Sequence, residues 1–190
     1  MYPEIYYCTR AAWVVVGFVW LLAAVVSKRT ARSEPVGSRL AHLAIMIAAF
    51  ALLFSSTLAL GPLGERFVPD RPAIAWTGFV LCVTGCAISI WARLMLGGNW
   101  SATVTVKQHH TLIRRGPYAV VRHPIYSGFL LAALGTSLVV GEWRGLLGLA
   151  LAVVGWRTKS RVEEAFMREQ FGAAYIDYQR DVKALIPFVL

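Results

Sequence analysis

The sequence predicts an all-α polytopic membrane protein with about five transmembrane helices. Of its 190 residues, 57% are hydrophobic and 15% are charged, and the mean hydropathy is +0.59. Soluble domains contain more charged residues, nearer a quarter of the chain. The apolar residues gather in long runs, and most of the basic residues lie between these runs. We therefore expect a single membrane domain that spans residues 1–190.

The first three apolar runs have the composition of membrane-spanning helices, although the first is short for a span and needs its flanking residues in the interfaces. Residues 61–62, Gly-Pro, end the second run, and a loop of mixed charge precedes the third. A polar and mostly extended stretch follows the third run. In order, these segments are the runs 11–26, 40–60 and 73–96, with the loop 64–72 between the last two, and the extended stretch 101–110.

Two further apolar runs, 125–140 and 145–156, face each other across residues 141–144. Both are too short for ordinary spans, so we expect a tight or re-entrant helical hairpin. The tail, residues 159–190, is polar and should be largely helical, with an amphipathic helix on the cytoplasmic side.

The distribution of basic residues predicts the orientation. Lys and Arg are concentrated in the first loop, in the segment 101–123 and in the tail, and the positive-inside rule places these three regions in the cytoplasm. The N-terminus then lies outside, and we expect a bacterial or archaeal inner membrane. The net charge of +9 is explained by these loops and by attraction to membrane lipids, so no nucleic-acid partner is expected.

The three cysteines, Cys8, Cys82 and Cys86, do not form a disulfide framework. Cys82 and Cys86 lie four residues apart in an apolar run, which is typical of buried thiols. No metal site is expected. The N-terminus lacks a basic region and a cleavage site, so the first apolar run should be retained rather than removed as a signal peptide.

The most informative stretch is 116–128, where Arg122 and His123 stand directly before Pro124. Proline is favoured in the first turn of a helix, so Arg122 and His123 should lie at a helix N-terminus. Unpaired N–H groups there favour an anionic ligand. Carboxylates return at Glu163 and Glu164, and the hairpin should bring Glu163 close to His123. Such a site suits a zwitterionic small molecule. We expect Glu164 to be the more expendable of the two acids.

Three ordered sets of residues resemble the isoprenylcysteine carboxyl methyltransferase family. They are 110–113 (His-Thr-Leu-Ile), 116–118 (Gly-Pro-Tyr) followed by 122–128 (Arg-His-Pro-Ile-Tyr-Ser-Gly), and a tail with Glu-Glu at 163–164, 171–175 (Phe-Gly-Ala-Ala-Tyr), Tyr178 and 186–188 (Ile-Pro-Phe). The resemblance covers residues 91–190, which we expect to be the catalytic, cofactor-binding half. Residues 1–72 match only as apolar spans of unknown role.

This resemblance implies an integral membrane methyltransferase that uses S-adenosylmethionine and acts on a lipophilic or lipidated substrate, most simply an isoprenylcysteine-type carboxylate. It implies that the following residues surround the cofactor: His110, Thr111, Leu112, Ile113, Tyr118, His123, Pro124, Ile125, Tyr126 and Glu163. Lys159 matches a substrate-binding position that is Arg in the eukaryotic pattern. We expect Arg122, His123 and Lys159 to serve the reaction itself.

Several alternatives stay open from the sequence. The acceptor could be a phospholipid amine or a small thiol, which would need a general base, and His123, His110 and Glu164 are candidates. Membrane sterol-type reductases have a similar carboxy-terminal half but would bind a nicotinamide dinucleotide. A non-enzymatic membrane bundle or small transporter is the third alternative. The sequence does not define the oligomeric state.

Overall fold

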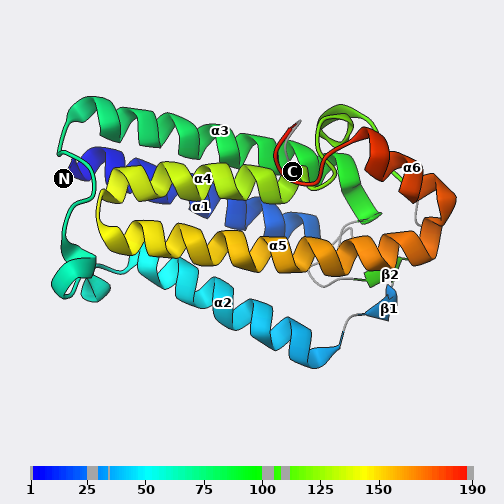
Figure 1. Cartoon of the computed structure of the whole chain (residues 1–190). Coiled ribbons are helices and arrows are strands. Elements are labelled where there is room, and N and C mark those ends of the chain that lie inside the picture. Colours follow the sequence, from blue (N-terminus) through cyan, green and yellow to red (C-terminus); the bar gives the residue numbers. More distant parts are fainter. Residues whose placement is uncertain (1, 25–29, 34, 100–104, 108–111, 188–190) are drawn as a thin grey trace.

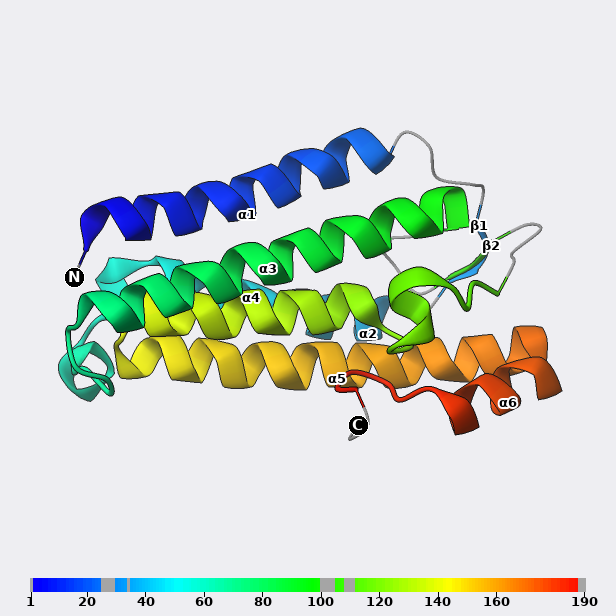
Figure 2. The same ribbon diagram turned by 90° about the horizontal axis from the view of Figure 1, so that it is seen from above.

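The structure is a computed structural model, and it describes residues 2–24, 30–33, 35–99, 105–107 and 112–187. Its long helices lie side by side (Figures 1 and 2). The helices are α1 (Pro3–Ala24), α2 (Val36–Phe54), α3 (Pro72–Leu96), α4 (Pro124–Val140), α5 (Trp143–Phe171) and the short α6 (Ala173–Asp181). Single 3-10 turns are η1 (Ser56–Leu58), η2 (Gly61–Gly64), η3 (Gly97–Asn99) and η4 (Gly116–Ala119).

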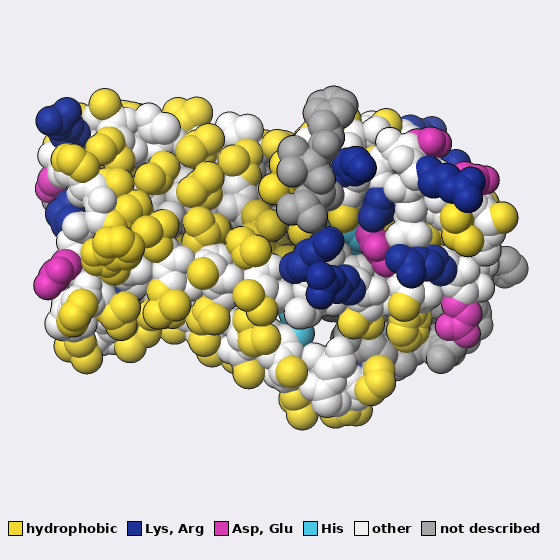
Figure 3. Space-filling view, viewed as in Figure 1, with side chains coloured by type: hydrophobic (Ala, Val, Ile, Leu, Met, Phe, Trp, Pro, Cys, Tyr) yellow, Lys and Arg dark blue, Asp and Glu magenta, His cyan; other side chains and the backbone are white. Residues whose placement is uncertain are grey.

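Three of these helices, α1, α2 and α3, are long and apolar enough to cross a membrane, and α4 is a shorter apolar helix. Hydrophobic side chains cover the surface over the long helices, whereas Lys and Arg gather at the end that carries α6 (Figure 3). An apolar surface of this extent next to a charged end is what a lipid environment requires. The structure therefore confirms an all-α integral membrane protein.

The predicted hairpin is longer than expected. Gly141 adopts a left-handed conformation (φ 70°) at the end of α4 and turns the chain into α5. The apolar run 145–156 is only the first part of α5, which continues without a break into the polar tail as far as Phe171. The expected separation between hairpin and tail is wrong, because the helical backbone continues when its surroundings change from apolar to polar.

The α3–α4 seam is the closest helix packing in the fold. A Cβ atom added at Gly135 would lie 2.3 Å from the backbone oxygen of Gly78, and one added at Gly85 would lie 2.4 Å from the backbone oxygen of Gly128. Backbones can approach this closely only where both helices carry small residues, which is a common arrangement in membranes. This seam fixes the start of α4 relative to α3.

Two loops that the sequence places on the same side of the membrane are joined at one end of the bundle. Strand β1 (Thr30–Ser33) follows α1, and strand β2 (Thr105–Lys107) lies between α3 and α4. The two pair in an antiparallel sheet, with Thr30 opposite Lys107. Part of the predicted extended stretch 101–110 is thus a strand, and the rest of it lies outside the described residues.

The opposite end of the bundle contains a buried arginine. Arg144 is 1% exposed, pairs with Glu142 and donates a hydrogen bond to the carbonyl oxygen of Leu52 (2.9 Å) at the end of α2. A cation near a helix C-terminus satisfies carbonyls that have no partner within the helix. Arg144 therefore joins α5 to α2 at this end of the bundle.

Candidate cofactor-binding site

The C-terminal tail runs beside the residues that precede α4. The backbone N–H of Arg122 donates to the carbonyl oxygen of Lys183 (2.8 Å), and that of His123 donates to Ala184 (3.0 Å). Pro124 has no N–H group to offer. The expectation that Arg122 and His123 present free N–H groups to an anionic ligand is therefore wrong, because the tail already uses both.

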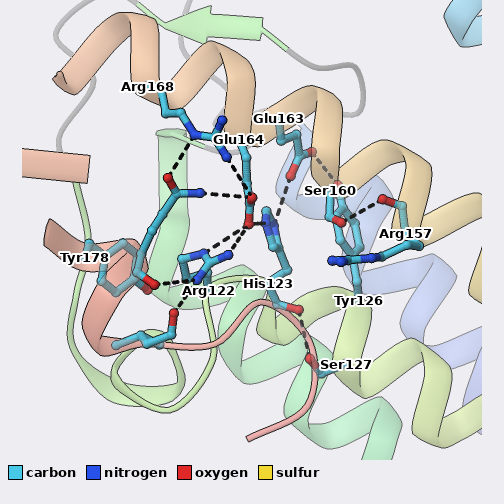
Figure 4. Close-up of polar contacts among 12 residues, drawn as sticks. Arg122, His123, Tyr126, Ser127, Arg157, Ser160, Glu163, Glu164, Arg168 and Tyr178 are labelled. Atoms are coloured by element: carbon cyan, nitrogen blue, oxygen red, sulfur yellow. Dashed lines mark hydrogen bonds and ion pairs between the residues drawn. The ribbon is translucent and has the colours of Figure 1, made fainter. Parts of the chain in front are cut away.

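Arg122 joins α4, α5 and the tail (Figure 4). Its Nε and Nη2 atoms donate to Glu164 Oε1 at 3.0 and 2.6 Å. Its Nη1 donates to the carbonyl oxygens of Gln179 (3.3 Å) and Val182. The side chain is 10% exposed, so these contacts occur away from bulk water. In this structure Arg122 donates hydrogen bonds to other parts of the protein, and its expected part in the reaction stays a prediction.

Glu164 is the centre of the polar network, although the sequence analysis expected it to be expendable. Besides Arg122, its Oε2 accepts a hydrogen bond from Gln179 Nε2 (3.0 Å) and lies 3.7 Å from Arg168 Nη2. Burial disfavours the charged carboxylate, but the hydrogen bonds and charges of His123 and Arg122 outweigh burial and lower the pKa of Glu164 to about 2. These contacts argue against the expectation that Glu164 is the more expendable of the two acids.

His123 lies between the two acids of α5. Its Nε2 is 3.2 Å from Glu164 Oε1, and its Nδ1 is 3.4 Å from Glu163 Oε2. Burial disfavours the charged imidazole, yet the hydrogen bonds and charges of the two carboxylates prevail and raise the pKa of His123 above 6.5. Because ionised carboxylates only accept hydrogen bonds, this arrangement favours an imidazolium with both nitrogens protonated.

Glu163 faces the predicted cofactor-binding residues. The hydroxyl of Tyr126 donates to its Oε1, and the Tyr126 ring stacks on His123 with ring centroids 5.6 Å apart. Burial alone would raise the pKa of Glu163, but the hydrogen bond and charge of His123, followed by the charge of Lys159, lower it. The Glu163 side chain is 25% exposed, compared with 10% for Glu164. Glu163 is therefore the more accessible acid.

An apolar wall adjoins this polar cluster. Tyr118 and Ile125 are buried and pack with Ala92, and Ile113 packs against them. The Tyr118 hydroxyl donates a hydrogen bond to the carbonyl oxygen of Ala92 (3.3 Å), so its proton is already engaged within the protein. Pro124 is buried and Leu112 is half-buried. His110 and Thr111 lie outside the described residues.

The structure thus brings His123, Tyr126 and Glu163 into one cluster, with Lys159 one helical turn before Glu163 on α5. Sequence reasoning assigned no site role to Gln179, which donates to Glu164, and it named Tyr178 only as part of the family resemblance. Tyr178 is 3% exposed, and its hydroxyl donates to the carbonyl oxygen of Tyr118. Tyr178 therefore packs inside the protein and joins α6 to the turn that precedes α4.

A family model and several known proteins match this chain. The family model described as phospholipid methyltransferase matches residues 73–174, which is more than half of the sequence. Protein-S-isoprenylcysteine O-methyltransferase B of Arabidopsis thaliana is 30% identical over 117 residues, which are 59% of this chain and 58% of that protein. The mouse protein-S-isoprenylcysteine O-methyltransferase is 30% identical over 131 residues, covering 65% of this chain and 46% of the relative.

A solved structure described as the eukaryotic intramembrane Ras methyltransferase ICMT (isoprenylcysteine carboxyl methyltransferase) shares the fold. The TM-score is 0.54 at 25% identity, and the match covers 78% of this chain and 52% of the other. An intramembrane helical bundle with a polar cluster at one end is thus the class of protein that the fold and site define. This chain belongs to the phospholipid methyltransferase family, and the predicted resemblance to isoprenylcysteine methyltransferases is confirmed.

These comparisons also limit what is carried over. The chain spans about half to three fifths of the length of the relatives named above. All of these relatives are eukaryotic or described as eukaryotic, so they give no support to the expected bacterial or archaeal membrane.

Proposed function

We propose that this protein is an S-adenosylmethionine-dependent methyltransferase that methylates a lipophilic acceptor, an isoprenylcysteine-type carboxylate. The observation that carries the proposal is the cluster of His123, Tyr126 and Glu163 inside the segment that matches the family model. His123 and Tyr126 lie at the start of α4, and Glu163 lies in the C-terminal part of α5, so the α4–α5 hairpin brings them together. The names of the relatives support the type of reaction and the type of acceptor.

The residues of the cluster fit such a cofactor. Glu163 offers a partly exposed carboxylate for a cationic group, and the ring of Tyr126, which stacks on His123, is an aromatic side chain beside it. The apolar wall of Ile113 and Ile125 suits a planar ring. These residues would hold S-adenosylmethionine, which when bound supplies a methyl group already activated by the sulfonium charge. His110 and Thr111 are proposed to complete the site on the strength of the resemblance alone.

The protonation of the cluster favours a carboxylate acceptor. An amine or thiol acceptor has to lose a proton to a base. The two carboxylates beside His123 favour its imidazolium form, and the low pKa of Glu164 makes it a weak base. A carboxylate acceptor needs no base, so the protein has only to align it and exclude water. Lys159, half-buried and one turn before Glu163, is the residue proposed to bind that carboxylate.

A phospholipid amine is the second candidate acceptor, because the family model that matches is described as phospholipid methyltransferase. The reductase and the non-enzymatic bundle are not favoured, since the relatives are named as methyltransferases. We propose that the α6 end of the bundle faces the cytoplasm, because the first loop and the tail on this end are rich in Lys and Arg (Figure 3). The acceptor would then reach the site from the bilayer.

The test is transfer of a labelled methyl group by protein purified in detergent. The acceptors are an S-prenylated N-acetylcysteine, phosphatidylethanolamine and a small thiol, each with S-adenosylmethionine as donor. Label should enter the prenylated cysteine as an alkali-labile ester. Transfer to phosphatidylethanolamine alone would show that the acceptor is a phospholipid amine and not a carboxylate. Transfer to none of them, by protein that is folded and binds the donor, would contradict the proposed acceptor.

A further inference from the structure

Two adjacent acids of α5 contact the same histidine but have different surroundings. Glu163 is partly exposed, and it contacts His123 and the Tyr126 hydroxyl. Glu164 is buried and is held by Arg122 and Gln179 as well. We propose that the acids have separate tasks: Glu163 faces the ligand, and Glu164 is a positioning residue that holds His123 and Arg122 against the C-terminal tail. The ligand-facing half of this inference rests on the proposed function, whereas the positioning half does not.

Both oxygens of Glu164 are committed to the protein (Figure 4). Oε1 accepts two hydrogen bonds from Arg122 and lies 3.2 Å from His123 Nε2. Oε2 accepts from Gln179, whose own side-chain oxygen accepts from Arg168 Nε (2.8 Å). A carboxylate with about four acceptor positions is nearly saturated by these donors. Glu164 therefore has little capacity left for a ligand.

Glu164 also determines where Arg122 points. The Arg122 guanidinium lies between Glu164 and the carbonyl oxygens of Gln179 and Val182. If the Glu164 charge is removed, the nearby acid that still carries a charge is Glu163, which also contacts His123. An arginine that turned toward Glu163 would compete with a cationic ligand. The positioning role thus includes keeping one cation away from the ligand-facing acid.

The protonation of His123 reports on Glu164 directly. The titratable and charged groups around His123 come from the turn before α4, from α4 and from α5, and they are Arg122, Tyr126, Lys159, Glu163, Glu164 and Arg168. From α6, Tyr175 is buried near the same acids and Arg122, and Tyr178 is buried near Arg122. Only Glu163 and Glu164 among these are anionic near neutral pH. Removal of either charge should therefore make His123 easier to deprotonate.

The experiment is a pH titration of histidine Cε1 resonances in full-length protein labelled with [13C]-histidine, in detergent and without ligand. The His123→Gln variant assigns the His123 signal. In the wild type, the midpoint for His123 should lie above the ordinary 6.5. In Glu164→Gln it should fall by about one pH unit or more. Glu169→Gln, an exposed acid on the same helix, is the matched control and should leave the midpoint unchanged.

A wild-type midpoint at or below 6.5 overturns the positioning half, and that measurement needs no variant to fold. An unchanged midpoint in folded Glu164→Gln overturns it as well. If the single variant does not fold because Arg122 loses its partner, the paired variant Arg122→Gln/Glu164→Gln should still lower the midpoint below that of the wild type, by less than the single variant, because the lost Arg122 cation offsets part of the lost Glu164 charge. S-adenosylmethionine binding by Glu163→Gln tests the other half: retained binding overturns the ligand-facing task even when the titration comes out as expected.

Discussion

Replacing Arg122 by Met should be among the most damaging single substitutions at the α6 end of the bundle. Met keeps much of the apolar volume but removes four hydrogen bonds, two to Glu164 and one each to the carbonyl oxygens of Gln179 and Val182. It leaves Glu164, whose side chain is 10% exposed, as a buried carboxylate without its hydrogen bonds from Arg122. Loss of one partner of a buried ion pair costs about 3–5 kcal/mol. For a chain of this size, that corresponds to a melting temperature lower by on the order of 10 °C.

The control is Arg180→Met, because Arg180 pairs with Asp177 on the surface with 76% of its side chain exposed. An exposed pair contributes only about 0.2–1 kcal/mol. Thermal unfolding followed by tryptophan fluorescence in one detergent compares the two variants with the wild type. If the melting temperature of Arg122→Met is as close to that of the wild type as that of Arg180→Met, the contacts of Arg122 with Glu164 and the tail contribute nothing to stability, and the reasoning is refuted.

Three further outcomes are expected. Because the pKa of Glu164 is lowered in the folded protein, Glu164 stabilises the fold above pH 4.5, and this contribution is lost as pH falls toward about 2. Because the pKa of His123 is raised, His123 contributes its full stabilisation below pH 6.5, and this contribution is lost as pH rises through the pKa of the folded protein. Melting temperature against pH should therefore be highest between these limits and flatter in Glu164→Gln; an identical profile for both proteins contradicts this. Gly135→Ala should lower the free energy of unfolding by about 1–3 kcal/mol in chemical unfolding, because its Cβ would meet the backbone of Gly78. Gly17→Ala is the control and should not lower it, because no atom lies within 4 Å of the added Cβ. Equal effects of the two substitutions would contradict the close packing of α3 against α4. Tyr178→Phe should lower the unfolding free energy by about 1 kcal/mol through the lost hydrogen bond to Tyr118, and no loss would show that this bond is worth nothing to the fold.

Much of the architecture follows from local composition. Hydropathy is a local property, so the runs that became α1 to α4 could be located from the sequence. The continuity of α5 was missed because the change from apolar to polar residues near Trp156 looks like a boundary, although nothing there breaks a helix. The glycine seam did leave a signal: Gly78 and Gly85 on α3, and Gly128 and Gly135 on α4, are each seven residues apart.

Only part of the candidate site could be predicted from the sequence. The approach of Glu163 to His123 followed from the hairpin, which returns the chain to the same end. The choice of Glu164 as the buried acid has no local signal, since its partner Arg122 lies 42 residues away and helix packing decides which of two adjacent side chains faces inward. The backbone contacts of Arg122 and His123 with the tail involve carbonyl groups, which every residue carries and no sequence motif identifies.

The central claim is that His123 and Glu163 hold one methyl donor between α4 and α5. Isothermal calorimetry of S-adenosylmethionine with purified protein in detergent tests it most directly, with Arg180→Ala as the surface control. The wild type and the control should bind with equal affinity, while His123→Ala and Glu163→Ala should show little or no binding. Wild-type affinity in both of these variants, each folded, would contradict the claim.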